Sequence, residues 1–324
     1  MEKMNIVEAI RNTLDEQMEK NDDIVVLGED VGVNGGVFRA TDGLQDKYGE
    51  ERVMDTPLDE AGILGTATGM AINGLRPVAE IQFSGFIPQA FHHIKQHISR
   101  MRMRTKGDIN IPMVIRAPYG GGIEALEHHS ESQEAIYSHI AGLKVVIPSN
   151  PSDAKNLLRE AIEDPDPVLF MEPKKIYRAF REEVKESKTP LGDANVVKTG
   201  EDITIVSWGA MFRETIDAVK EIEEKRDVTV EMIDPRTINP LDQETILESV
   251  RKTGRLVVVS EEPRTASMAS EISAIVSEEA ILSLKSPIKR ITGFDIPYPL
   301  YQHEDVYMPN KEDIKRRMEE SLDF

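Results

Sequence analysis

Short apolar runs that alternate with longer segments of helical period are the feature of this sequence that most constrains its fold. The runs are four to eight residues long, and the segments between them repeat their apolar residues every three to four positions. This order is typical of crossover units, in which helices cover the faces of a largely parallel sheet. We therefore predict an α/β fold.

The predicted elements fall into two groups along the chain. In the first group, strands are expected at 24–29, 76–83, 112–118, 143–148 and 167–173, and helices at 6–17, 60–72, 88–102 and 151–163. In the second group, strands are expected at 202–208, 227–234 and 255–262, and helices near 211–225, 241–252 and 267–280. Residues 181–192 are charged and lack apolar period, so we expect a linker there and two domains, 1–185 and 186–324.

The composition excludes several classes of protein. The chain has 39 Lys and Arg against 58 Asp and Glu, a formal net charge of −19, and no Cys. An acidic surface repels phosphate backbones, and no apolar run approaches the roughly 18 residues that span a bilayer. The absence of Cys excludes disulfides, thiolate metal sites and Cys nucleophiles and fits a reducing compartment. We therefore predict a cytoplasmic protein that binds neither nucleic acid nor membranes.

The common motifs for phosphate binding and nucleophilic catalysis are absent from the sequence. There is no GxGxxG after a strand, no GxxxxGK[ST] loop, no GxSxG turn and no HExxH. The glycine clusters at 35–36 and 120–122 lie in predicted strand-to-helix loops. Glycine in such loops more often permits a positive φ than it contacts a ligand.

Glu60 stands at the start of the predicted helix 60–72, which carries few charges and a stripe of glycines. One interpretation is a solvated first-turn carboxylate stabilised by the helix dipole, as Asp59 would also be. The other is burial, because a helix of this composition is suited to close packing. A buried carboxyl has a raised pKa and can share a proton with a ligand nitrogen.

Aromatic residues and histidines follow two of the predicted strands. Phe83 and Phe86 lie beyond a strand end, where open parallel sheets bind ligands, although aromatic residues there most often belong to the core. His128 and His129 are adjacent within 120–132, and imidazole exchanges protons near neutral pH. The alternative for each histidine is an ordinary loop residue.

A second histidine group lies in the predicted helix 88–102. His93 and His97 are four residues apart, which is a metal-ligand spacing, but no acid completes such a motif. We expect a subunit interface there instead, with the basic run 95–106 in the same contact. The individual roles of His92, His93 and His97 stay open.

These segments together resemble the β subunit of the first, decarboxylating component of 2-oxoacid dehydrogenase complexes. That component is a thiamine diphosphate enzyme acting on pyruvate or branched-chain 2-oxoacids. The similar stretches run nearly from end to end and include VVLGEDVG, RPVAEIQFSGF, HHSES, GLKVVIPSNPSDAKNLL, IDPRTINPLD and KTGRLVVVSEEPRTA. The resemblance implies a transketolase-like pyrimidine-binding domain over 1–185 and a transketolase C-terminal-like α/β domain over 186–324 that mainly assembles subunits.

The resemblance also implies functional residues. Glu60, in a TP-x-x-E context, matches the acid whose carboxyl bonds the pyrimidine ring nitrogen and favours the imino tautomer that removes the thiazolium proton. His129 matches a histidine that handles protons or positions the lipoyl group, whereas His128 has no counterpart. The cofactor-binding positions implied are Glu29, Leu58, Glu60, Gln82 and Phe86.

A structural potassium site is a further implication of the resemblance. It would involve main-chain oxygens near Met113, Ala161 and Ile162, together with Asp164 and Asp166. Pro165 alters the local spacing of this set.

One motif of the family is absent, and its absence implies a partner. The family binds the diphosphate and its Mg²⁺ with Gly-Asp-Gly at a strand end and a later Asn-Asn, whereas here Gly192-Asp193 is followed by Ala194. The resemblance therefore implies an α subunit that supplies this half of the site in an α2β2 heterotetramer. The acyl group would pass to a lipoyl acyltransferase core, whose basic subunit-binding domain we expect on the acidic second domain.

Other interpretations stay open. A single-chain enzyme such as transketolase or deoxyxylulose-phosphate synthase needs a diphosphate domain that 324 residues cannot add. A non-catalytic scaffold or electron-transfer subunit would keep the fold without the chemistry. The stretches DKYG, HHSES and MEPKKIYR look closer to the branched-chain enzymes, but the sequence does not decide between the two substrates.

Overall fold

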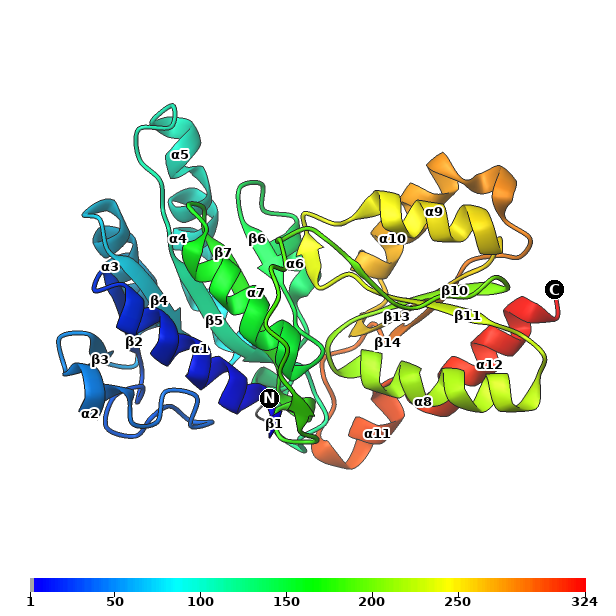
Figure 1. Cartoon of the computed structure of the whole chain (residues 1–324), viewed down its shortest axis with the longest axis horizontal. Helices are drawn as coiled ribbons and strands as arrows, with labels where there is room; N and C mark the ends of the chain where they lie inside the picture. Colours follow the sequence, from blue (N-terminus) through cyan, green and yellow to red (C-terminus); the bar gives the residue numbers. More distant parts are fainter. Residues whose placement is uncertain (1–2) are drawn as a thin grey trace.

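Two large sheets stand side by side in the computed structural model, which describes residues 3–324 (Figure 1). The first sheet has seven strands in the order β12-β6-β7-β5-β4-β2-β3, and the second has five in the order β14-β13-β10-β11-β9. A two-stranded pair, β1 and β8, completes the sheets formed by these residues. The predicted α/β fold is confirmed.

The first half of the chain contributes eight strands: β1 (Lys3–Met4), β2 (Ile24–Gly28), β3 (Val53–Asp55), β4 (Arg76–Glu80), β5 (Val114–Tyr119), β6 (Lys144–Val146), β7 (Val168–Pro173) and β8 (Glu182–Glu183). Its α-helices are α1 (Ile6–Lys20), α2 (Leu44–Tyr48), α3 (Glu60–Ile72), α4 (Phe91–Gln96), α5 (Met101–Arg104), α6 (Glu134–Ser138) and α7 (Pro151–Glu163). Its 3-10 turns are η1 (Ser84–Ala90), η2 (Ile98–Arg100), η3 (Glu127–His129) and η4 (Lys174–Ile176).

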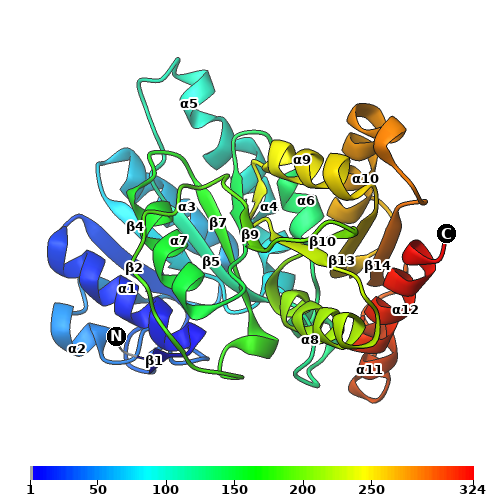
Figure 2. The same cartoon turned by 45° about the vertical axis from the view of Figure 1, so that its right-hand side comes forward.

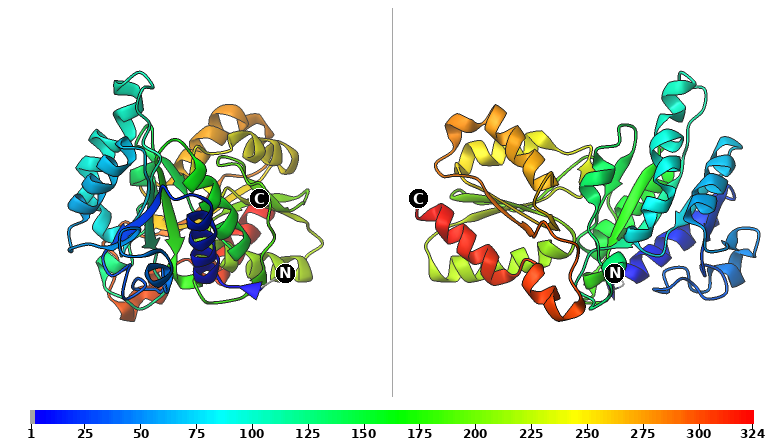
Figure 3. Two further views of the ribbon diagram at one scale, coloured as in Figure 1. Left: turned by 60° about the vertical axis from the view of Figure 1, so that its left-hand side comes forward. Right: turned by 180° about the vertical axis from the view of Figure 1, so that it is seen from behind.

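The second half contributes β9 (Asn195–Lys198), β10 (Ile203–Ser207), β11 (Val230–Asp234), β12 (Thr237–Asn239), β13 (Leu256–Pro263) and β14 (Lys289–Gly293). Its helices are α8 (Gly209–Lys225), α9 (Gln243–Thr253), α10 (Met268–Glu279), α11 (Glu304–Tyr307) and α12 (Lys311–Leu322), with η5 (Ile281–Ser283) and η6 (Tyr301–His303). Helices α9 and α10 cover one face of the second sheet, and α8 and α12 cover the other (Figures 2 and 3).

Alternating side chains of the first sheet build two separate core layers. Val26, Val78 and Val114 point to the face covered by α1 and α7, whereas Leu27 and Ala79 point to the face covered by α3. Every residue of β2 is buried, as expected for a parallel strand with helices on both faces. This is why these strands read as continuous apolar runs.

Strands β2 to β7 of the first sheet are parallel to one another. Their carboxyl ends therefore meet at one edge of the sheet, which is where open sheets of this kind bind ligands. The loops after β2, β3, β4 and β5 begin at this edge. They carry Glu29, Glu60, Phe86 and His129, in that order.

The last strand of the first sheet comes from the second half of the chain. β12 pairs antiparallel with β6, with Thr237 opposite Val146. The two halves thus share a sheet, which no signal in the sequence had indicated.

The predicted helix 88–102 is wrong as one continuous helix, because the structure divides this segment into short helical pieces. The structure has the 3-10 turn η1 from Ser84, then α4, η2 and α5. Pro88 lies inside η1, and because proline has no N–H it cannot continue an α-helical hydrogen-bond ladder. His97, with φ −118° and ψ −65°, ends α4, and the centre of its ring lies 5.9 Å from that of His93.

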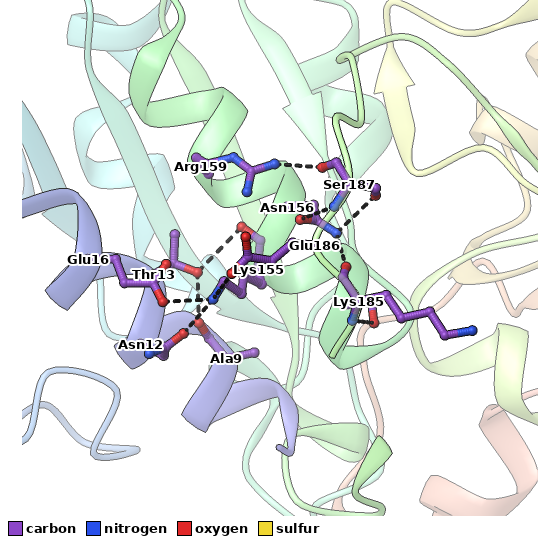
Figure 4. Close-up of polar contacts among 11 residues, drawn as sticks. Ala9, Asn12, Thr13, Glu16, Lys155, Asn156, Arg159, Lys185, Glu186 and Ser187 are labelled. Atoms are coloured by element: carbon purple, nitrogen blue, oxygen red, sulfur yellow. Dashed lines mark hydrogen bonds and ion pairs between the residues drawn. The ribbon is translucent and has the colours of Figure 1, made fainter. Parts of the chain in front are cut away.

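The expected linker, residues 181–192, is hydrogen-bonded to the first domain (Figure 4). The side-chain amide of Asn156 on α7 donates to the carbonyl of Lys185 at 2.8 Å, and Arg159 donates to the carbonyl of Ser187 at 2.6 Å. Lys155 on the same helix lies 2.8 Å from Glu16 on α1 and 3.2 Å from Glu186. One helix therefore holds both α1 and the segment that leads to the second domain.

Candidate functional site

Two neighbouring acids at the start of α3 have different environments. Asp59 is exposed and caps the helix, since its carboxylate accepts the N–H of Gly62 at 2.9 Å. Glu60 is buried, with 5% of its surface exposed, and its Oε2 has no hydrogen-bond partner. The solvated interpretation of Glu60 is thereby excluded. A buried carboxyl oxygen without a partner is costly, which makes this atom a candidate contact for a ligand.

Glu29, directly after β2, lies within electrostatic reach of Glu60. Burial raises the pKa of Glu29, and the nearby carboxylates of Asp30 and Glu60 raise it further. The structure therefore brings two of the predicted site residues together as a pair of acids at the carboxyl edge of the first sheet.

Aromatic rings surround His129 on the adjacent loop. The ring of His129 lies 4.4 Å from that of Phe83 and 5.3 Å from that of Phe86, both edge to face. Its Nδ1 is buried and has no partner, whereas His128 is exposed. The structure thus brings together His129 and Phe86, and leaves one imidazole nitrogen available for a ligand or a proton.

The turn that carries Phe86 touches the histidine loop through its backbone. The hydroxyl of Ser84 donates to the carbonyl of Glu131 at 3.0 Å. A Cβ on Gly85 would lie only 2.0 Å from the carbonyl oxygen of His128, so no other residue fits there without moving the loop. η1 packs against α3 on one side and η3 on the other, and thus joins the acid pair to the histidine loop.

The other predicted cofactor residues have less distinctive surroundings. Leu58, in the turn before α3, is 71% exposed, and Gln82 is half-buried between β4 and η1. Both lie at the same edge of the sheet. Their contact with a cofactor stays a prediction, as do the roles of Glu29, Glu60, Phe86 and His129.

The residues of the predicted potassium site lie at the opposite edge of the sheet. Arg76 donates to the carbonyl of Ile162 at 2.8 Å, and the ammonium of Lys144 lies 2.5 Å from the carboxylate of Asp164. Arg102 pairs with Asp166. The carbonyl of Met113 accepts the backbone N–H of Val168 at 3.0 Å, and Ala161 is buried in α7. Most of these oxygens have partners within the chain, and the potassium site stays a prediction.

A buried ionic network beneath the site was not predicted. Arg116 on β5 bonds Glu172 on β7 at 2.7 Å and Glu80 on β4 at 2.8 Å, and all three side chains are at most 4% exposed. Burial acts to lower the pKa of Arg116, but Glu172 and Glu80 outweigh it and raise that pKa, while burial raises the pKa of Glu80. The sequence feature that could have indicated this network is the single charged residue buried in each of three apolar strands, Glu80 in β4, Arg116 in β5 and Glu172 in β7.

A second buried cluster lies where the two halves of the chain meet. Glu134 on α6 accepts the indole N–H of Trp208 at 3.0 Å, and burial, reinforced by the carboxylate of Glu261, raises its pKa to about 7. Burial likewise raises the pKa of Glu262, and it lowers the pKa of Lys174 to about 7. The junction therefore holds protons on carboxyl groups near neutral pH.

This cluster predicts a pH-dependent effect of Glu134→Gln. Between pH 4.5, the ordinary pKa of a glutamate, and about pH 7, Glu134 stays protonated in the folded protein but is ionised in the unfolded chain. The free energy of unfolding of the parent protein therefore falls as pH rises through this range. Glutamine mimics the protonated form at every pH. We expect the difference in unfolding free energy between the Gln variant and the parent to shift in favour of the variant by about 2 kcal/mol from pH 5 to pH 8. Urea unfolding at each pH measures the gain, and a difference independent of pH would contradict it.

Among residues 3–324, no group of three or more His, Cys, Asp or Glu side chains could hold a metal ion. No helix within the same range is long and apolar enough to cross a membrane.

The sequence matches two known domain families over nearly its whole length. Residues 2–179 match the pyrimidine-binding domain of transketolase, and residues 192–314 match the transketolase C-terminal domain. A solved split-gene transketolase, described as an inactive beta4 tetramer, has the same fold, with a TM-score of 0.82 over 99% of each chain at 22% identity. The site thus lies in a transketolase-type pyrimidine-binding domain.

Full-length relatives narrow the class further. The pyruvate dehydrogenase E1 component subunit beta of Acholeplasma laidlawii is 52% identical over 96% of this chain and 95% of its own length. The proteins of the same name from Staphylococcus epidermidis strain RP62A and Staphylococcus aureus strain Mu50 are each 48% identical over the full length of both chains. The chain belongs to the family of E1 β subunits of 2-oxoacid dehydrogenase complexes.

Proposed function

We propose that this chain is the β subunit of a thiamine diphosphate-dependent pyruvate dehydrogenase that is active only with an α subunit. The observation that carries the proposal is the buried Oε2 of Glu60, which lacks a partner at the carboxyl edge of a pyrimidine-binding domain. The names of the full-length relatives favour pyruvate over the branched-chain 2-oxoacids.

The residues of this chain would hold the pyrimidine end of the cofactor. Thiamine diphosphate, when bound, supplies the nucleophilic carbon and the electron sink that decarboxylation of a 2-oxoacid requires. Glu60 would hold a proton at Oε2 for the pyrimidine ring nitrogen. Glu29 would add a second carboxyl group, with a raised pKa, beside it. Phe86 would pack against the flat ring. His129, whose Nδ1 is free, would carry a proton or orient the incoming acyl acceptor.

The proposal requires partners. An α subunit would bind the diphosphate and its Mg²⁺, so that the active site lies between chains of an α2β2 heterotetramer. The acyl group would pass to lipoyl groups of an acyltransferase core, docked on the acidic C-terminal domain by complementary charge. The cytoplasm stays the expected compartment.

Substrate choice tests the proposal directly. The chain is co-expressed with its α subunit, and decarboxylation of pyruvate is compared with that of 3-methyl-2-oxobutanoate, using an artificial electron acceptor. We expect kcat/KM to favour pyruvate by about tenfold to a hundredfold, the usual discrimination for one or two carbon atoms in a pocket. A preference for 3-methyl-2-oxobutanoate would show that the proposed substrate is wrong. Inactivity with every 2-oxoacid would contradict the proposed function itself.

A further inference from the structure

The loop that carries His129 has little regular structure of its own. Residues 120–132 contain only the single 3-10 turn η3, yet Nδ1 of His129 is buried against Phe83 and Phe86. Within the first domain, the loop is anchored by Ser84 and by a hydrogen bond from the N–H of Gly120 to the carbonyl of Glu131 at 3.2 Å. The first of these contacts holds the end of the loop, and the second ties the first residue of the loop to that end.

Residues 122 and 124 of the loop are held by the C-terminal domain. The carboxylate of Glu304, the first residue of α11, accepts the N–H of Gly122 on Oε1 at 2.8 Å and that of Glu124 on Oε2 at 2.9 Å. The hydroxyl of Tyr298 donates to the same Oε1 at 2.6 Å. Glu304 is 4% exposed, so solvent competes little for these bonds. Helix α11 lies beside the junction of the two domains (Figures 1 and 3).

A second carboxylate of the C-terminal domain acts on the adjacent residue. Glu261, in β13, accepts the N–H of Gly121 at 3.2 Å, and Lys174 donates to the carbonyl of Gly120 at 2.6 Å. Backbone groups of 120, 121, 122 and 124 are thus all bonded to side chains outside the loop. These contacts fix the path of the chain up to residue 124, five residues before His129.

The close approach of neighbouring side chains to residues 120–122 explains why these three consecutive residues are glycines. A Cβ on Gly121 would lie 1.8 Å from the hydroxyl of Tyr298, and one on Gly120 would lie 2.3 Å from Oε1 of Glu261. Gly120 and Gly122 also have φ values of +84° and +82°, which disfavour other residues. Gly120 and Gly121 therefore permit close contact with the C-terminal domain, whereas a Cβ on Gly122 would lie 2.6 Å from the side chain of Lys175 in the first domain.

We call Glu304 and Tyr298 the clamp, and the conformation of Glu124 is the one that the clamp favours. Its φ is +57°, in the left-handed region that residues other than glycine seldom adopt. The hydrogen bond from its N–H to Glu304 compensates for that conformation. Without this hydrogen bond, nothing offsets the cost of the left-handed conformation at residue 124, and the backbone of the loop can move to a more favourable one.

We propose that Glu304 and Tyr298 are positioning residues for His129: the C-terminal domain, beyond its part in assembly, fixes the loop that presents this histidine. The inference rests on the proposed function only for the task that His129 performs. The order of the loop itself is a physical property that is measured without any substrate.

Hydrogen exchange in the α/β complex tests the order of the loop. In Glu304→Gln the side-chain amide nitrogen faces a backbone N–H, so at least one of the two bonds is lost. We expect backbone amides of 121–131 to exchange at least about tenfold faster, with a smaller increase in Tyr298→Phe, which removes one donor and keeps the ring. Asp305→Asn, at the exposed neighbouring position, is the matched control and should leave exchange unchanged. Unchanged exchange in both clamp variants would overturn the inference, whether or not the complex is active.

A double-mutant cycle tests whether the clamp acts through His129. Acyl transfer to a lipoyl domain is measured for Glu304→Gln, His129→Ala and the double variant. We expect Glu304→Gln to lower kcat about tenfold with less than a twofold change in KM for the 2-oxoacid, and to add almost nothing when His129 is already absent. Equal effects of Glu304→Gln in both backgrounds would refute the positioning role. Tyr298→Phe replaces Glu304→Gln in the cycle if the latter fails to assemble.

Discussion

Glu60→Gln is expected to lower turnover of the assembled α/β enzyme by about a hundredfold or more. Glutamine matches the shape of glutamate but cannot hold an acidic proton at Oε2, the buried atom that lacks a partner. Because the substrate itself does not contact this residue in the proposed function, KM for the 2-oxoacid should change little. Steady-state decarboxylation with an artificial electron acceptor measures both parameters.

Asp59→Asn provides a matched control one residue away. Asp59 is exposed and caps α3, and asparagine caps a helix about as well as aspartate does. This variant should therefore retain full turnover and stability. If Glu60→Gln also retained full turnover, the chain would be a non-catalytic scaffold or electron-transfer subunit with the fold of an enzyme.

Arg116→Met is expected to have the largest effect on stability, a loss of about 3–5 kcal/mol. The change leaves Glu80 and Glu172 facing each other without the cation that compensates their burial. Since burial already raises the pKa of Glu80 in the presence of Arg116, removing the guanidinium must favour its protonated form further. Urea unfolding of the chain monitored by circular dichroism gives the free energy of unfolding.

The exposed pair of Arg102 and Asp166 is the comparison for this experiment. Its members are 53% and 25% exposed, so Arg102→Met should cost less than about 1 kcal/mol. Similar losses in the two variants would mean that burial of Arg116 does not determine its contribution.

The strands were predictable because their environment is uniform. A parallel strand buried on both faces needs apolar side chains throughout, so β2 and β10 stand out as continuous apolar runs. The helices α3 and α7 were predicted with their observed bounds. Short elements such as β12 carry too few residues for any period. Their place is decided by the surrounding sheet.

The site was predictable only in part. Resemblance pointed to Glu60 and His129, but periodicity could not decide between a solvated and a buried Glu60, because that depends on how η1 and α3 pack. The two partners of Arg116, Glu172 and Glu80, lie 56 and 36 residues away in sequence, which no local pattern encodes. The glycines at 120–122 were expected to permit a turn, and the structure adds the side chains that approach them.

The place of β12 has a consequence for any attempt to dissect the protein. A fragment ending at residue 185 would lack β12, and β6 would become the outer strand of its sheet. The exposed N–H and C=O groups of that strand would then be free to pair with another molecule, a known route to aggregation. Structural studies of the isolated N-terminal half would thus report on a self-associating species, and the boundary suggested by the linker is no guide to where the chain can be cut.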